Sequence, residues 1–197
     1  MKKIITISRE FGSGGRTIGK HLAEELGVPC YDSEIIEKVA IESGFAEEYV
    51  QEKGEHTHPS LLYSLFTNRT IYTGPTNEDK IWIIQCKVIK ELAEKGPCVI
   101  VGRCADYILR NRDDVMKVFI YGDVEARAKR IVEVYGEKDD APVKRIKDKD
   151  KRRAAYYQHY TDMNWGASRN YHICLDSSFI GIDECVKILK DIALNAD

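Results

Sequence analysis

The sequence predicts one α/β domain over residues 1–197, in which a five-stranded parallel sheet lies between two layers of helices. Two observations support this fold class. Short apolar or β-branched runs alternate with segments of helical period, which is the pattern of β-α-β units. The first run, residues 4–7, leads directly into a glycine-rich loop and then into a helical segment. In such folds the ligand site lies at the carboxyl ends of the strands.

The elements follow one another in a regular order. The expected strands are short apolar runs at residues 4–7, 28–31, 98–101, 116–121 and 171–175. The expected helices occupy residues 17–26, 33–41, 80–95, a segment that begins near 124, and residues 182–194. Gly27 is a typical helix end, and Asp32 is a typical N-cap for the helix that follows it.

Two segments do not fit the core pattern. Residues from about 44 to 80 mix short helical patterns with glycine and proline, which indicates a helical insertion. Residues from about 136 to 165 include a highly charged stretch with few apolar positions. We expect this second segment to be a mobile lid, because few buried contacts would hold it in place.

The composition narrows the class of protein. The formal net charge is only −2, so no basic field indicates binding to nucleic acid. The longest apolar runs are about five or six residues, far short of the roughly 20 that a membrane span needs. The six cysteines form no C-x-x-C pair, which favours reduced thiols and a cytoplasmic location.

The loop at residues 8–17 has the features of a phosphate-binding site. Gly12, Gly14 and Gly15 allow backbone N–H groups to converge, and the helix that follows presents free donors and a favourable dipole to an anion. A ligand-free β-α turn is the alternative interpretation. We favour phosphate binding, because three glycines in four positions are unusual for a simple turn.

This loop and the helix after it resemble the nucleoside monophosphate kinases, and most closely the cytidylate kinase-like proteins. That family has a P-loop of the form G-P-S-G-x-G-K-G-T. An ungapped match places Arg9 at its first glycine, Thr17 at its threonine and Gly15 at its lysine. The lysine is therefore absent. Arg16 is the nearest cation in the loop, and Arg9 lies at the loop mouth. Either could supply the missing charge, and we expect Arg16 to do so unless it faces solvent.

Other segments resemble the family's substrate-binding elements. Residues 101–106 are similar to the segment whose arginine holds the acceptor phosphate, and residues 125–130 to the one that leads into the lid. By this resemblance the catalytic residues are Arg16, Arg127 and Arg130. The loop residues that bind ATP are Gly12, Ser13, Gly14, Gly15, Arg16 and Thr17. The substrate residues are Asp32, Ser33, Arg103, Asp106, Arg152 and Arg153, and Thr17 and Asp106 would place Mg²⁺.

The resemblance implies an ATP-dependent kinase of a small phosphate acceptor, with a nucleoside monophosphate as the first expectation. The family's cytosine-reading motif is not preserved at residues 149–156, so base specificity does not carry over. Two alternatives remain open at this stage: a nucleotide-binding regulator without turnover, and a kinase of another metabolite. The tyrosines near residues 156–160 could stack a base, pack the lid helix or form a homodimer contact.

Overall fold

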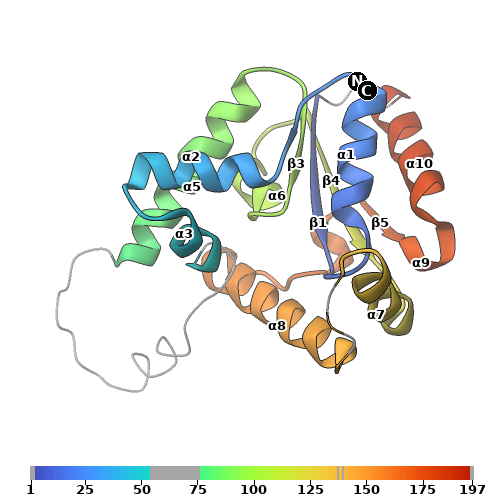
Figure 1. Ribbon diagram of the computed structural model, residues 1–197. Coiled ribbons are helices and arrows are strands. Elements are labelled where there is room, and N and C mark those ends of the chain that lie inside the picture. Colours follow the sequence, from blue (N-terminus) through green and yellow to red (C-terminus); the bar gives the residue numbers. More distant parts are fainter. Residues whose placement is uncertain (1–2, 54–75, 137, 139, 196–197) are drawn as a thin grey trace.

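The computed structural model describes residues 3–53, 76–136, 138 and 140–195 (Figure 1). Much of the expected insertion, residues 54–75, lies outside this part of the chain. The described residues form a parallel sheet in the order β2-β3-β1-β4-β5. Its strands are β1 (Ile4–Arg9), β2 (Cys30–Tyr31), β3 (Cys98–Val101), β4 (Val115–Tyr121) and β5 (Ile173–Asp176). The predicted five-stranded parallel sheet is confirmed.

The sheet is buried on both faces. Successive residues of a strand point to opposite sides, so β1 places Ile5 and Ile7 in one apolar cluster and Ile4 in the other. The strand β3 divides in the same way, with Val99 and Val101 on the first side. A continuous apolar run is what two-sided burial requires, and this explains why these strands do not alternate with polar residues.

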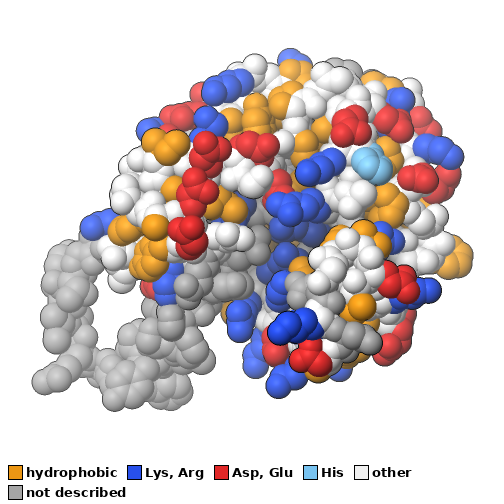
Figure 2. Space-filling model, in the orientation of Figure 1, with side chains coloured by type: hydrophobic (Ala, Val, Ile, Leu, Met, Phe, Trp, Pro, Cys, Tyr) orange, Lys and Arg blue, Asp and Glu red, His pale blue; other side chains and the backbone are white. Residues whose placement is uncertain are grey.

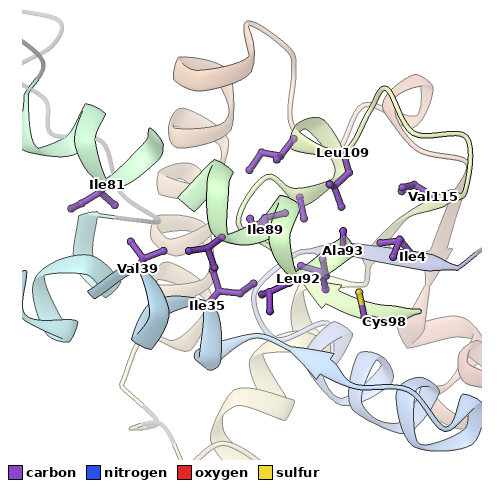
Figure 3. Close-up of a cluster of buried hydrophobic side chains, with 14 of the residues drawn as sticks. Ile4, Ile35, Val39, Ile81, Ile89, Leu92, Ala93, Cys98, Leu109 and Val115 are labelled. Carbon is purple, nitrogen blue, oxygen red and sulfur yellow. The ribbon is translucent and has the colours of Figure 1, made fainter. Parts of the chain in front are cut away.

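Helices cover both faces and complete the three layers (Figure 1). On one face α1 (Gly15–Leu26) and α10 (Ile182–Asn195) pack against the sheet. On the other face α2 (Ser33–Ser43) and α5 (Asn77–Glu94) contribute to the cluster drawn in Figure 3. Ile89 of α5 is fully buried in that cluster.

The helix ends follow local chemistry. Gly27 ends α1 with a left-handed φ of 65°, as expected. Thr76 and Asp79 form a reciprocal capping box at the start of α5, three residues before the expected start. Asp32 is the N-cap residue of α2, but no hydrogen bond of its side chain caps that helix. Its carboxylate is instead paired with Arg16.

The remaining helical segments connect these elements along the chain. They are α3 (Glu47–Lys53), α6 (Ala105–Ile108), α7 (Val124–Glu133), α8 (Pro142–Thr161), a 3₁₀ turn (Ser168–Asn170) and α9 (Ser177–Ile180). Within the described residues, none of the helices is long and apolar enough to cross a membrane.

The helix α8 occupies most of the expected lid, and it buries more than its charge suggested. Ile146 is fully buried against α7, and Tyr156, Tyr157 and Thr161 are each no more than 5% exposed. The expectation of few core residues holds for the first part of this helix, where Ile146 is the buried residue, and not for its last two turns. Trp82 of α5 stacks on Tyr160 with ring centroids 4.4 Å apart, so these aromatic side chains pack the helix.

Candidate functional site

A cavity of about 610 Å³ lies at the carboxyl ends of β1, β2 and β3. Such a volume suits a small-molecule ligand, and its position is the one that parallel α/β sheets use for ligands. Six cationic side chains line it, against three acidic ones. The cations are Arg9, Arg16, Arg103, Lys149, Arg152 and Arg153, and the acids are Glu10, Asp32 and Glu48. Figure 2 shows Lys and Arg side chains gathered along the hollow in the middle of this face.

The glycine loop forms one wall of the cavity. Gly12 and Gly14 have φ values of 81° and 78°, the left-handed region that favours glycine. Gly14 is the N-cap of α1, and within the described chain no side-chain hydrogen bond caps that helix. The first N–H groups of α1, those of Gly15, Arg16 and Thr17, have no carbonyl one turn earlier to bind. These donors, together with the helix dipole, are suited to an anion.

The rest of the protein holds the loop in place. The Ser13 hydroxyl donates to the carbonyl of Glu10 at 2.9 Å, so this side chain supports the loop from inside and does not line the cavity. Ser177 of α9 donates to the Ser13 carbonyl at 2.6 Å. A Cβ on Gly12 would lie 2.9 Å from the Arg127 carbonyl, so glycine also permits α7 to approach closely.

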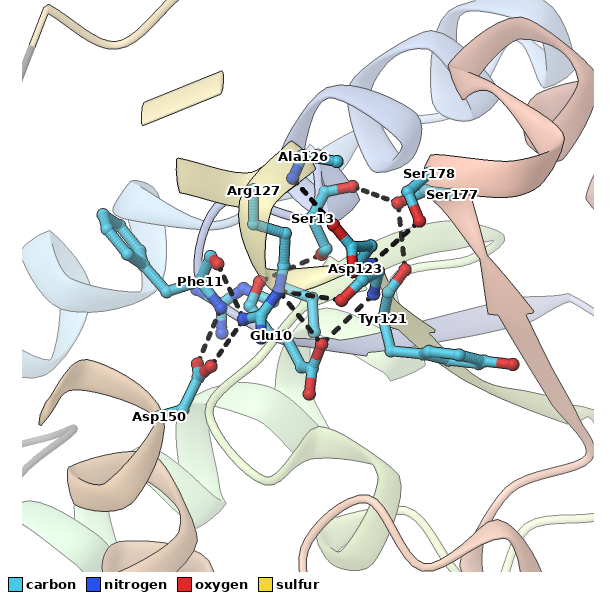
Figure 4. Close-up of polar contacts among 12 residues, drawn as sticks. Glu10, Phe11, Ser13, Tyr121, Asp123, Ala126, Arg127, Asp150, Ser177 and Ser178 are labelled. Carbon is cyan, nitrogen blue, oxygen red and sulfur yellow. Dashed lines mark hydrogen bonds and ion pairs between the residues drawn. The ribbon is translucent and has the colours of Figure 1, made fainter. Parts of the chain in front are cut away.

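Arg127 stabilises this loop and does not line the cavity. Its guanidinium donates to the carbonyls of Gly122 and Phe11 and, at 2.6 Å, to the carboxylate of Asp150 on α8 (Figure 4). Asp150 also accepts the backbone N–H of Phe11 at 2.7 Å. Burial raises the pKa of Glu10, and the nearby guanidinium of Arg127 opposes that shift. This arrangement does not support the phosphate contact that was expected for Arg127.

Arg130 lies one turn further along α7 and has a different environment. Its Nη1 atom is 3.5 Å from the position that a Cβ would occupy on Gly14. The two arginines share a helix face as expected, and neither lines the cavity. Arg127 contacts the loop at Phe11 and Gly12, whereas the guanidinium of Arg130 lies near Gly14 at the start of α1. Arg130 therefore lies close to the expected anion site.

Arg103 follows β3 in an unusual backbone turn. Gly102, Arg103 and Cys104 have φ values of 77°, 57° and 53°, and left-handed conformations are uncommon for residues other than glycine. Gln85 supports the turn by donating to the Arg103 carbonyl at 3.2 Å. The Arg103 side chain lines the cavity, and its Nη1 atom is buried without a hydrogen-bond partner in the described structure. A buried, unsatisfied guanidinium donor beside a basic cavity suits an anionic ligand.

Asp106 is not brought to the cavity. It is 2% exposed, and its carboxylate accepts hydrogen bonds from Tyr157 at 2.7 Å and from Ser8 at 3.2 Å. Burial raises its pKa, although both hydrogen bonds oppose the shift. We conclude that this geometry does not support direct Mg²⁺ coordination by Asp106. Thr17, the other expected Mg²⁺ residue, lies on the first turn of α1 and is not among the residues that line the cavity.

The other expected substrate residues are distributed unevenly. Asp32 lines the cavity, and its carboxylate forms an ion pair with Nε of Arg16, whose side chain is 59% exposed. Ser33 is exposed and does not line the cavity. Arg152 and Arg153 of α8 both line it, and Arg153 donates to the Arg9 carbonyl at 3.1 Å.

The sequence offered Arg9 only as the second choice after Arg16 for the missing charge, yet the side chain of Arg9 crosses the cavity wall. A Cβ on Gly15 would lie 2.5 Å from the Cβ of Arg9, and a Cβ on Gly102 would lie 2.9 Å from its Cζ. Arg9 thus extends from the start of α1 to the end of β3. The signal in the sequence was the pair of departures from the family motif, arginine for glycine at 9 and glycine for lysine at 15.

Comparison with known proteins identifies the family. The model of the cytidylate kinase-like family matches residues 4–179. Cytidylate kinases of Methanopyrus kandleri and Archaeoglobus fulgidus are 24% and 27% identical, over 95% and 94% of this chain and 91% of each relative. A cytidylate kinase of Pyrococcus horikoshii is 29% identical over 68% of this chain, but the match spans only 59% of that protein.

Solved structures show the same fold. An uncharacterized protein from Eubacterium ventriosum superposes with a TM-score of 0.73 and 29% identity, over 98% of both chains. A shikimate kinase from Acinetobacter baumannii has a TM-score of 0.54 at 20% identity, over 98% of this chain and 94% of that one. The glycine loop, the parallel sheet and the family match agree, and the chain therefore belongs to the cytidylate kinase-like family.

Proposed function

We propose that this protein is an ATP-dependent phosphotransferase whose acceptor is a small phosphorylated molecule, with a nucleoside monophosphate as the first candidate. The observation that carries the proposal is one cavity with two features suited to phosphate. The uncapped start of α1 forms one, and the buried, unsatisfied guanidinium of Arg103 forms the other. The cytidylate kinase relatives support this choice of reaction.

In this proposal the N–H groups of residues 14–17 bind the donor phosphates and Arg103 binds the acceptor phosphate. An oxygen of the acceptor phosphate attacks the γ-phosphorus of ATP. The bond from that phosphorus to the β–γ bridging oxygen breaks, and ADP leaves. The attacking oxygen is already ionised near pH 7, so the protein needs no general base. Its task is to position the two phosphates and to stabilise their charge.

Each cationic residue would act on the phosphates nearest to it. Arg130, over the glycine loop, and Arg152 and Arg153, on α8, would neutralise charge on the transferring group. Mg²⁺ bound with ATP would neutralise the β and γ phosphates, and the hydroxyl of Thr17 would contact it. A cytoplasmic location and a homodimer are also parts of the proposal; sedimentation of the purified protein tests the second.

The experiment couples ADP release to a panel of acceptors that includes the four ribonucleoside monophosphates, their deoxy forms and non-nucleotide metabolites. Arg103→Ala should raise the KM for the accepted molecule by about tenfold or more, the scale of a charge-assisted hydrogen bond, and leave the Kd of ATP nearly unchanged. Arg103→Lys should recover part of the loss. Turnover with a non-nucleotide alone would identify the metabolite kinase, and ATP binding without turnover on any acceptor would favour a regulator.

A further inference from the structure

The residue at the expected lysine position, Gly15, raises a question that its own backbone does not answer. It is the first residue of α1, and its φ is not in the left-handed region. Its backbone conformation would therefore accept an L side chain without strain. A reason for glycine at this position must come from its surroundings.

The surroundings consist mainly of Arg9. A Cβ on Gly15 would lie 2.5 Å from the Cβ of Arg9, closer than real Cβ atoms approach other heavy atoms, and 3.1 Å from its Cγ. The stem of Arg9 occupies the space that a lysine at position 15 would need. A side chain at position 9, arginine included, is thus sterically incompatible with a lysine at position 15 in this loop.

The guanidinium of Arg9 lies beside Gly102, at the other end of its side chain. A Cβ on Gly102 would meet its Cζ at 2.9 Å, and Gly102 directly precedes Arg103. The guanidinium of Arg9 is therefore beside the turn that contains Arg103, the residue proposed to bind the acceptor phosphate. Arg9 and Arg103 also both line a second, smaller cavity of about 30 Å³ next to the main one.

We propose that Arg9 is the cation that replaces the P-loop lysine and contacts the phosphoryl group during transfer. Its stem begins at the start of α1, where the donor phosphates would bind, and its head ends at Arg103, where the acceptor would bind. A planar guanidinium has five donors, so it can bridge oxygens of both phosphates. This inference rests on the proposed function and adds to it a catalytic residue.

Arg16 is the competing candidate, and the geometry favours Arg9. Arg16 points its Nε to the carboxylate of Asp32, and its side chain is 59% exposed. Screening by water weakens a cation in that position. The side chain of Arg9, in contrast, runs from beside Gly15 to beside Gly102, between the two proposed phosphate sites.

Calorimetry with ATP and with inorganic tripolyphosphate tests the inference directly. Arg9→Ala should raise the Kd of both ligands by about 10- to 100-fold, because the lost contact is to phosphate, and should lower kcat at least as much. Arg16→Ala should have a smaller effect on both. Arg169→Ala, at an exposed arginine outside the cavities described, should leave both constants unchanged.

A double exchange tests whether arginine at position 9 and lysine at position 15 are alternatives, while the loss in Arg9→Ala tests the contact of Arg9 with phosphate. Gly15→Lys alone should impair binding, since the new side chain meets Arg9. Arg9→Gly combined with Gly15→Lys recreates the ordinary loop and should bind ATP at least about threefold more tightly than the two single effects predict. Melting curves confirm that each variant is folded, and Arg9→Gln, which keeps length but not charge, carries the test if Arg9→Ala does not fold.

The outcomes separate the inference from the proposed function. ATP affinity and turnover that are unchanged in Arg9→Ala, or a larger loss in Arg16→Ala, would overturn the role of Arg9 while the kinase activity stands. Absence of rescue in the double exchange would also count against it. A wild-type protein that binds neither ATP nor tripolyphosphate would overturn the proposed function together with this inference.

Discussion

Tyr157 of α8 donates a 2.7 Å hydrogen bond to Asp106 of α6, whose carboxylate also accepts from Ser8 at the end of β1. The hydroxyl of Tyr157 and the carboxylate of Asp106 therefore connect the lid helix to the central strand. Asp106 is almost fully buried, so these two donors are what makes its burial tolerable.

Replacement of Tyr157 by phenylalanine should reduce the free energy of unfolding by about 1–3 kcal/mol, because it leaves a buried carboxyl with one donor fewer. Urea titration of both proteins measures the difference. Tyr160→Phe is the matched control on the same helix, and its loss should be smaller because the Tyr160 ring mainly stacks on Trp82. Equal losses would show that the Tyr157–Asp106 bond contributes nothing specific.

The stability of the protein should depend on pH through Asp106. Burial raises its pKa in the folded state above the ordinary value of 3.8, so the folded state holds this proton more tightly than the unfolded chain does. The resulting stabilisation is present at low pH and is lost as the pH rises from about 3.8 through the folded-state pKa. Asp106→Asn removes it.

The unfolding free energy of the wild type, minus that of Asp106→Asn, should therefore fall as the pH rises across this window. Urea titrations at several pH values measure this slope, which a constant loss of packing in the variant would not change. A difference that increases with pH would contradict the raised pKa.

Loss of Arg127 should destabilise the fold itself. Arg127→Ala would leave Asp150 and Glu10 without their shared cation. Both carboxylates are partly buried, so the loss should be about 1.5–3 kcal/mol, the scale of hydrogen bonds to charged groups. Arg130→Ala should change the free energy of unfolding by less than about 1 kcal/mol, since it is only half-buried. Denaturant midpoints of the two variants provide the measurement, and similar values would disprove this division of roles.

The lid segment should exchange its amide protons unevenly when no nucleotide is bound. The first half of α8 has one buried residue, Ile146, whereas its last two turns bury Tyr156, Tyr157 and Thr161. We expect fast exchange from about residue 136 to 153, slower exchange beyond it, and protection of the first half by ATP. Hydrogen exchange with mass spectrometry measures this, and exchange as slow at 142–153 as in β1 would rule out a mobile lid.

Several features of the fold followed from the sequence because they depend on local chemistry. Alternate residues of a strand face opposite sides, so the apolar run of β1 predicted a strand buried on both faces. Gly27 ended the first helix, and the glycines before it indicated the loop. Arg103 was singled out by the family resemblance and by its position just after a strand, at the edge where parallel sheets bind ligands, and it lines the cavity.

The partners of long polar side chains depended on tertiary structure. Arg127 and Arg130 share a helix face, but only the positions of Asp150 and Gly14, from distant segments, separate a structural arginine from one over the loop. The carboxylate of Asp106 was expected at a metal and lies instead between Tyr157 and Ser8. Spacing along the chain fixes the direction in which a side chain leaves the backbone. The groups that it meets come from elements far away in sequence, and only the packing of those elements decided that Arg9 crosses Gly15 and that Arg16 turns to Asp32.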